Sequence, residues 1–151
     1  MDFVRPHVLD KKLVSSLSCI SESISELNLP KNIKVHLPIK DVLIYGDYHN
    51  LQIVFKNLIL NAVQAIGKSD GQITIRIGNE ERCNIIEIED SGPGFDENKK
   101  SKIFEPLITS KQEGTGLGLL SCKNIIENHK GQIDVKLHPT RFIIWLPKNK
   151  F

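Results

Sequence analysis

The chain has 151 residues, 40% of them hydrophobic and 25% charged, a composition typical of one globular domain of roughly 100 to 200 residues. Its 20 basic and 18 acidic side chains are interspersed and give a net charge of +2, which excludes the basic stripe of a nucleic-acid-binding protein. The segment "MDFVRPHVLD" lacks a signal-peptide core and no apolar run approaches about 18 residues, so we expect a cytoplasmic domain without membrane contact, whether or not the full-length protein is membrane-anchored.

The first half of the sequence predicts two helices on either side of two short strands. The helical pattern of the segment "LDKKLVSSLSCISESISELNLP" stops before Pro30 and predicts a helix of about five turns. Its residues at helical spacing are Leu13, Leu17, Ile20, Ile24 and Leu27. Residues 32–38 and 41–47 predict two short strands around a turn. Residues 48–68, "YHNLQIVFKNLILNAVQAIGK", give the strongest helical pattern of the chain.

The second half predicts a hairpin, a long connection, a helix and a final pair of strands. Residues 71–78 and 83–90 alternate apolar and polar side chains, which predicts a hairpin that turns near Gly78 and Asn79. Residues 96–116 form a long polar connection with one short helix near residues 99–104, and a helix follows Gly116. Residues 131–137 and 141–147 predict the last two strands. These elements predict an α+β fold, a two-layer α/β sandwich whose mixed sheet of about five strands carries about three helices on one face.

Polar side chains form one narrow stripe on the helix expected over residues 50–68. At about 100° per residue the stripe is about 60° wide, and its members are Asn50, Asn57, Asn61, Gln64 and Lys68. We expect this otherwise apolar helix to be buried, where an amide without a partner costs about 1 to 3 kcal/mol. Asn50 and Lys68 fit a solvated edge, whereas Asn57 and Asn61, in mid-helix, favour a bound ligand or ion. An amide oxygen suits Mg²⁺.

Asp90 ends a strand-like run, "NIIEIEDSGPGF". Alternation places Asp90 on the same face as Ile86 and Ile88, so its carboxylate should point inward with the apolar side chains. Ionised Asp only accepts hydrogen bonds, so such a pocket would select a ligand with an amino group, as adenine has and guanine lacks at the corresponding position. Gly92 and Gly94 would let the backbone approach the ligand closely. The D-S-G-P-G run also fits an ordinary turn at the end of a strand.

Gly114, Gly116 and Gly118 lie where a loop runs directly into a helix. The unpaired N–H groups at the start of a helix, at the positive end of its dipole, form a site for phosphate. Thr115 would add a hydroxyl donor and Lys111 a positive charge. The same glycines also fit a flexible linker, and their spacing differs from that of a P-loop or a dinucleotide fingerprint.

In this order, the three features resemble the ATP-binding fold shared by gyrase, Hsp90, MutL and histidine kinases, a Bergerat-type fold. "NLILNAVQAI" is similar to the N box, "DSGPGF" to the first glycine box, "IFEPLITSK" to the F box and "GTGLGL" to the second glycine box of sensor histidine kinases. The similarity is strong from about Asp47 to Pro147 and looser before it. The chain therefore resembles the ATP-binding catalytic domain of a sensor histidine kinase.

The resemblance implies a site for ATP and Mg²⁺. Asn61 would bind Mg²⁺, and Asp90 would accept a hydrogen bond from the adenine amino group. Residues 96–113, with Phe104 and Lys111, would form a mobile lid over the nucleotide. In "HPTRF" the family usually has Gly-Thr-x-Phe; Thr140 fits that pattern and Pro139 departs from it. The other implied nucleotide contacts are Gly92, Gly94, Gly114, Thr115, Gly116, Leu117 and Gly118.

Asn57 distinguishes between the activities of the superfamily. In members that hydrolyse ATP, the position one helical turn before the Mg²⁺-binding Asn is a Glu, which acts as a base toward water. An amide cannot take that proton, so we expect poor hydrolysis and transfer of the γ-phosphoryl group to a protein histidine. The domain would supply positioning and charge neutralisation, and the expected catalytic residues are Asn57, Asn61 and Lys111.

The phosphate-accepting histidine of the family is absent from this sequence. It is normally followed by an acidic residue, with a proline a few positions on, and none of the five histidines has that context: His7, His36, His49, His129 and His138. The resemblance implies that residues 1–10 are the remnant of a dimerisation-hairpin helix and linker, and that residues 11–151 form the catalytic domain. The implied partners are a dimerisation domain that bears the histidine, in the same full-length protein or in trans, and a response regulator.

Two other classes of function remain open at this point. One is a non-catalytic ATP-binding module that senses or scaffolds, and the other is a gyrase-type ATPase or a serine kinase that inactivates an anti-sigma partner. Asn61, Asp90 and the glycines of the second glycine box favour the histidine kinase over the scaffold. Asn57 weighs against the ATPase.

Overall fold

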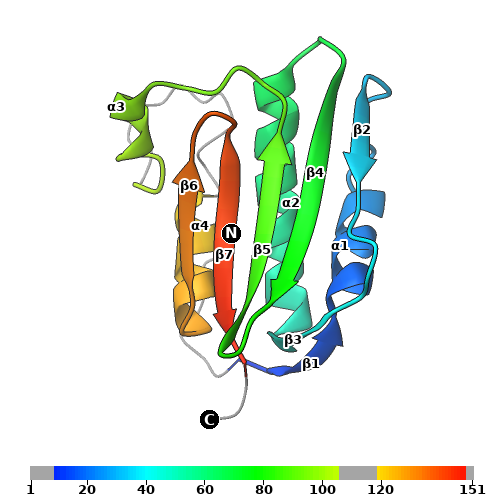
Figure 1. Cartoon of the computed structure of the whole chain (residues 1–151), viewed down its shortest axis with the longest axis vertical. Helices are drawn as coiled ribbons and strands as arrows, with labels where there is room; N and C mark the ends of the chain where they lie inside the picture. Colours follow the sequence, from blue (N-terminus) through cyan, green and yellow to red (C-terminus); the bar gives the residue numbers. More distant parts are fainter. Residues whose placement is uncertain (1–8, 106–118, 149–151) are drawn as a thin grey trace.

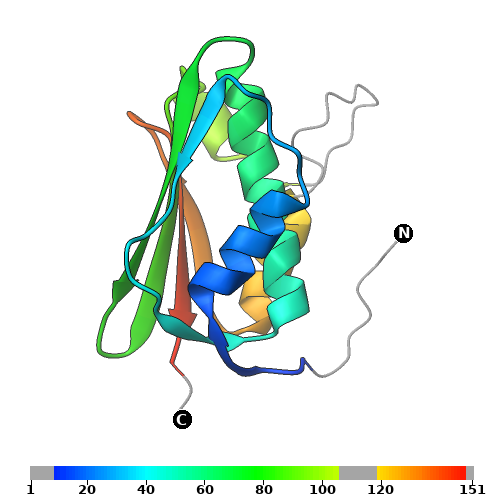
Figure 2. The ribbon, with the colours of Figure 1, turned by 90° about the vertical axis from the view of Figure 1, so that its right-hand side faces the viewer.

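A mixed five-stranded sheet with helices on one face makes up most of the described chain. The computed structural model describes residues 9–105 and 119–148. The strands of the main sheet lie in the order β2 (Ile33–His36), β4 (Gly71–Asn79), β5 (Cys83–Asp90), β7 (Arg141–Pro147) and β6 (Gln132–Lys136). Figures 1 and 2 show that α1 (Ser16–Ser25), α2 (Tyr48–Ile66) and α4 (Leu119–Asn128) cover one face. The short α3 (Glu97–Lys100) follows β5. The predicted two-layer α/β sandwich is confirmed.

The core lies between α2 and the central strands. Helix α2 has a buried apolar face, Leu51, Val54, Phe55, Leu58, Ile59, Ala62 and Ile66, and its first turn is capped by the Asp47 carboxylate, which accepts from the Asn50 N–H. Strand β5 alternates strictly between buried and half-buried residues, and its buried set includes Ile86 and Ile88. The opposite face of β5 carries Glu87 and Glu89, which pair with Arg76 of β4. The apolar face of the helix and the inward-facing side chains of the strands therefore pack together in one core.

The start of the chain differs from the prediction of one helix from Leu9. Residues Lys12–Ser15 form strand β1, which pairs antiparallel with β3 (Leu43–Gly46) in a separate two-stranded sheet. Helix α1 begins only at Ser16, because the Ser15 side chain accepts from the Ser18 N–H and caps it. Leu13, which fitted the helical spacing, is 60% exposed. The prediction that the helix includes the residues before Ser16 is therefore wrong, although Leu13 fits the helical spacing.

The two short strands over residues 32–38 and 41–47 do form, but they do not pair around a turn. Strand β2 pairs in parallel with β4, whereas β3 pairs with β1. The other pairs of the main sheet are antiparallel. Strand β2 therefore makes the sheet mixed, and the predicted pairs β4–β5 and β6–β7 are confirmed.

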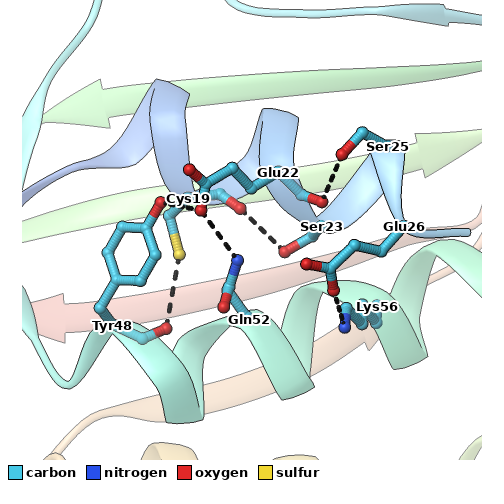
Figure 3. A network of polar contacts seen from close by, with 8 residues as sticks. All are labelled: Cys19, Glu22, Ser23, Ser25, Glu26, Tyr48, Gln52 and Lys56. Carbon is cyan, nitrogen blue, oxygen red and sulfur yellow. Dashed lines mark hydrogen bonds and ion pairs between the residues drawn. The ribbon is translucent and has the colours of Figure 1, made fainter.

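A surface network fixes α1 against α2 (Figure 3). The Glu22 Oε1 atom accepts from the Tyr48 hydroxyl at 2.6 Å and from Gln52 Nε2 at 3.3 Å. Lys56 of α2 forms an ion pair with Glu26, the residue that caps the end of α1. Beneath these contacts Cys19 is fully buried, and burial raises the pKa of its thiol to about 12. The thiol therefore acts as a small apolar packing group.

His129 joins the end of α4 to the start of α2. It is 2% exposed, its Nε2 accepts from the Asp47 N–H at 3.0 Å, and its Nδ1 lies 2.8 Å from the Ile125 carbonyl oxygen. This arrangement requires a neutral ring with the proton on Nδ1, because a protonated Nε2 would face another donor. Burial lowers the pKa of His129, against the hydrogen bond to Ile125, which raises it. These contacts give His129 a structural role between α4 and α2.

We expect the free energy of unfolding to decline as the pH falls below about 6.5, the ordinary pKa of histidine. The native pKa of His129 is lowered, so the unfolded chain binds the proton first, and stability is lost between 6.5 and the native pKa. Urea unfolding between pH 7.5 and 5 should show this slope in the wild type and in His49→Gln, an exposed control. His129→Gln should be less stable at pH 7.5 but should lack the slope; a slope retained in that variant would contradict the assignment.

Candidate functional site

Asp90, the last residue of β5, points into the core layer. It lies opposite Ile73 of β4 in the strand register and is only 4% exposed. On its other side, its N–H donates to the Thr140 carbonyl oxygen, directly before β7, at 3.1 Å. Paired residues in antiparallel strands present their side chains to the same face. The predicted inward direction of the Asp90 carboxylate is confirmed.

The Asp90 carboxylate retains the capacity to accept hydrogen bonds. Among the residues that the structure describes, one donor contacts it, the Gly92 N–H at 2.8 Å from Oδ1. Burial raises the pKa of Asp90, the hydrogen bond from Gly92 lowers it, and the charge of Glu89 raises it further. A buried carboxylate with one donor can still accept further hydrogen bonds, so it suits a ligand that carries an amino group.

Thr140 lies beside Asp90 with an unused hydroxyl. It is 4% exposed, and its Oγ1 is the buried side-chain oxygen or nitrogen without a hydrogen-bond partner in the described part of the chain. A Cβ at Gly94, where φ is +84°, would lie 3.1 Å from this oxygen. Buried polar atoms without partners are rare and call for a ligand or water. Asp90, Gly92, Gly94 and Thr140 therefore gather at one end of the sheet.

Asn57 and Asn61 lie on α2, two turns and one turn before Ala65, whose carbonyl group faces Gly92. A Cβ at Gly92 would lie 2.8 Å from the Ala65 carbonyl oxygen, and positions 57, 61 and 65 share one face of an α-helix. Both asparagines are half-buried, which corrects the expectation that they are buried. Two apolar residues of the same helix, Ile53 and Leu60, are exposed at 36% and 40%, so one side of α2 faces solvent. The cost of burying an amide therefore does not by itself demand a ligand here.

Asn57 also contacts α4. Its side chain hydrogen-bonds to the Cys122 thiol, which lowers the pKa of that thiol, but burial dominates and raises it to about 12. Cys122 Sγ also lies 3.9 Å from the Val54 carbonyl oxygen. The amide of Asn57 thus has a contact on the helix that follows the second glycine box.

Phe104 packs against the sheet from the connection after β5. Its ring makes an edge-to-face contact with Phe142 of β7, with 6.1 Å between the ring centroids. The helix of this connection is α3, Glu97–Lys100, which begins slightly before the predicted residues 99–104. Lys111 and the second glycine box, Gly114, Thr115, Gly116, Leu117 and Gly118, lie outside the described residues.

Two residues at this end were not singled out from the sequence. Ala65 bounds the space at Gly92 with its carbonyl group, and Ser91 accepts a hydrogen bond from the Gln72 N–H through its hydroxyl. Both residue types are common on helices and in turns, so only their position relative to Asp90 and Gly92 marks them. For Ser91, the signal in the sequence was its place between Asp90 and the first glycine.

A Gly92→Ala exchange is expected to destabilise the protein and weaken any ligand binding at Asp90. The new Cβ would lie 2.8 Å from the Ala65 carbonyl oxygen and 3.0 Å from Asp90 Oδ1, so the backbone must shift, at a cost of about 1 to 3 kcal/mol. Gly78→Ala is the matched control, because its nearest neighbours would be 3.9 Å away. Thermal unfolding of the two variants tests this; equal transition temperatures would contradict the crowding at Gly92.

A hollow lies away from this cluster. Its volume is about 750 Å³, and its walls come from β1, β3, the loop before β3 and the far ends of β4, β5 and β7. Among the predicted nucleotide residues that the structure describes, none lines it. Nor does any helix within residues 9–105 or 119–148 combine the length and apolar character needed to cross a membrane.

Comparison with known proteins identifies the family. Residues 46–150 match the model of the histidine kinase-, DNA gyrase B- and HSP90-like ATPase family. Sporulation kinase A of Bacillus subtilis (strain 168) is 38% identical over 148 residues, which cover 96% of this chain and 24% of that kinase. The chain thus spans about a quarter of the length of this relative.

Solved structures agree with the sequence match. The nucleotide-free catalytic domain of histidine kinase ThkA is 30% identical, with a TM-score of 0.82 and coverage of 93% of this chain and 97% of that domain. A structure of ThkA in complex with the response regulator protein TrrA matches with 26% identity and a TM-score of 0.72, over 92% of this chain and 42% of that one. The chain belongs to the histidine kinase-, DNA gyrase B- and HSP90-like ATPase family, as an ATP-binding catalytic domain of the sensor histidine kinase type.

Proposed function

We propose that this domain binds Mg·ATP and donates the γ-phosphoryl group to a histidine on a separate dimerisation domain. The observation that carries the proposal is the buried Asp90 carboxylate beside the Thr140 hydroxyl, which has no hydrogen-bond partner among the described residues. Together they offer an acceptor and a hydroxyl at the end of the sheet where Gly92 and Gly94 leave the backbone bare. A purine with an exocyclic amino group matches this arrangement.

Asp90 supplies the selectivity for adenine. Its carboxylate accepts from the adenine amino group, whereas the guanine oxygen at that position would face a second acceptor. The Thr140 hydroxyl can donate to a ring nitrogen or to an intervening water. Phe104, held against Phe142, supplies apolar surface next to this end of the sheet.

Asn61 fits a role as a protein ligand of Mg²⁺. Its amide is half-buried on α2, one turn before Ala65, and an amide oxygen is a hard, neutral ligand of the kind Mg²⁺ accepts together with waters and phosphate oxygens. Bound there, the ion would neutralise charge on the phosphates. Asn57, one turn before Asn61, carries an amide and therefore offers no base toward water.

The chemistry requires little covalent participation by this chain. A ring nitrogen of the acceptor histidine forms the N–P bond as the bond between the γ-phosphorus and the β–γ bridging oxygen breaks, and ADP leaves. The contributions of the domain are orientation and charge neutralisation. We assign the phosphate contacts to Lys111 and to residues 114–118, Gly114, Thr115, Gly116, Leu117 and Gly118.

The proposed partners are the histidine-bearing dimerisation domain and a response regulator. ThkA is seen in complex with such a regulator, and the same domain type supports this assignment here. Residues 1–10 would be the end of the dimerisation hairpin and its linker, and residues 11–151 the catalytic domain.

The decisive experiment mixes the domain with a histidine-bearing dimerisation hairpin and γ-labelled ATP. Acid-labile, base-stable label on the hairpin histidine supports the kinase. ATP binding without transfer, in the presence of the hairpin, would instead support a scaffold, and release of labelled phosphate without the hairpin would support an ATPase.

We expect Asn61→Ala to make nucleotide binding insensitive to Mg²⁺, because the variant loses the amide oxygen. ATP affinity measured by calorimetry with Mg²⁺ and with EDTA should differ in the wild type and be similar in the variant. Asn50→Ala, the same exchange near the start of the same helix, is the control. Retained Mg²⁺ dependence in Asn61→Ala would count against this role.

A further inference from the structure

Strands β4 and β5 stop pairing in an unusual way beside Asp90. Their register runs without interruption to the pair Ile73 and Asp90. The next pair in this register is Gln72 with Ser91, and the Ser91 N–H does donate to the Gln72 carbonyl oxygen at 3.1 Å. An antiparallel pair of this kind normally exchanges two backbone hydrogen bonds.

The second bond of this pair comes from a side chain. The Gln72 N–H donates to the Ser91 hydroxyl at 2.9 Å, where a regular ladder would use the Ser91 carbonyl oxygen. The hydroxyl therefore satisfies the Gln72 N–H, near the start of β4, and takes the place of the Ser91 carbonyl group in the ladder. The chain can turn away immediately after Asp90.

This early exit is what brings Gly92 back to Asp90. The Gly92 N–H donates to Asp90 Oδ1 at 2.8 Å, a contact between residues two apart that a continuing extended strand would not allow. The space around the exit is tight: a Cβ at Gly71 would lie 2.9 Å from Ser91 Oγ, and one at Gly92 would lie 2.8 Å from the Ala65 carbonyl oxygen. The turn is thus confined on both sides.

We propose that Ser91 is a positioning residue for the nucleotide, which holds the Asp90 carboxylate in its orientation by ending the β4–β5 ladder with its hydroxyl. The inference rests on the proposed binding of ATP at Asp90. Without the hydroxyl, Gln72 would bond to the Ser91 carbonyl group, the strand would extend by one pair, and Gly92 would be pulled from Oδ1. The carboxylate would then lose the donor that fixes it.

The test compares Ser91→Ala with Ser91→Thr, which keeps the hydroxyl and can place its methyl group outward, since Ser91 is exposed. The first measurement is the amide proton shift of Gly92 by NMR in the nucleotide-free protein. The second is the ratio of ATP to GTP affinity by calorimetry. Ser25→Ala, which removes another exposed hydroxyl bonded to a backbone carbonyl oxygen, is the control.

We expect Ser91→Ala to move the Gly92 amide proton upfield and to lower ATP affinity by about 3- to 10-fold, the effect of one hydrogen bond, with a smaller ATP/GTP ratio. Ser91→Thr and Ser25→Ala should match the wild type. Two results would overturn the role of Ser91 and leave the proposed function standing. One is an unchanged ATP/GTP affinity ratio and an unchanged Gly92 amide proton shift in Ser91→Ala. The other is a change in both quantities in Ser91→Thr. A wild type that binds neither nucleotide would overturn the proposed function and this role with it.

Discussion

Asp90→Asn is expected to lower ATP affinity by about 10- to 100-fold, because a hydrogen bond to a charged group contributes about 1.5 to 3 kcal/mol. The asparagine amide can place an N–H₂ group toward the adenine amino group, where two donors meet. The same group suits the oxygen that guanine carries there, so the preference for ATP over GTP should disappear. Calorimetric titration with both nucleotides measures this result.

The same variant should not be less stable at neutral pH. Burial raises the native pKa of Asp90 above the ordinary 3.8, so the native state keeps the proton where the unfolded chain has lost it. Stability therefore declines as the pH rises from 3.8 through the native pKa and stays lower above it. Asparagine carries no charge and keeps an acceptor for the Gly92 N–H, so its stability should lack this decline.

Asp134→Asn is the matched control, since Asp134 is an exposed carboxylate on strand β6. It should bind ATP like the wild type. Unchanged ATP affinity in Asp90→Asn would defeat the adenine assignment, and a large loss of stability in that variant would show that affinity was lost through unfolding. A loss of affinity at equal or higher stability is the outcome that supports a binding role.

Leu58→Ala is expected to lower the free energy of unfolding by about 2 to 5 kcal/mol, the range for truncating a fully buried leucine. Leu58 is fully buried on the apolar face of α2, where it belongs to the core between this helix and the sheet. For a chain of this size, the loss should lower the transition temperature by roughly 5 to 15 °C. Urea and thermal unfolding both measure it.

Leu60→Ala makes the same exchange two positions along the same helix, at a residue that is 40% exposed. The free energy of unfolding should change by no more than about 0.5 kcal/mol, as for most surface exchanges. The high helix propensity of alanine offsets part of any loss. Equal losses at Leu58 and Leu60 would contradict the placement of the core. The pair separates burial from residue type and helix position.

The elements with strong local patterns were predictable from the sequence. Helix α2 combines an apolar face with a capping Asp47, and β4 and β5 alternate across a short turn, so pattern and partner lie close in the chain. The first helix was predicted too long because Leu13 fits a helical period as well as a strand. Leu13 lies in strand β1, whose partner β3 is about 30 residues further along the chain. Local periodicity contains no information about such a distant partner.

The candidate site shows the same division. The alternation of apolar and polar residues in β5 predicted that Asp90 points inward, and its burial in the structure confirms this. The burial of Asn57 and Asn61 was overestimated, because the apolar residues Ile53 and Leu60 on the same helix are exposed rather than packed. A helical wheel gives the width of a polar stripe but not which neighbours cover its edges.

The sequence by itself determined the class of fold, the direction of Asp90 and the family motifs, because each depends on short-range periodicity or on residues close together in the chain. Only the tertiary structure decided that β2 joins β4 in parallel and that Ser91 ends the ladder with its side chain. It also decided that Thr140 lies beside Asp90 with a hydroxyl that no other described residue satisfies. These features arise from strand pairing between distant segments. Which of several compatible partners a strand takes is settled by the burial of the whole domain, not by the strand alone.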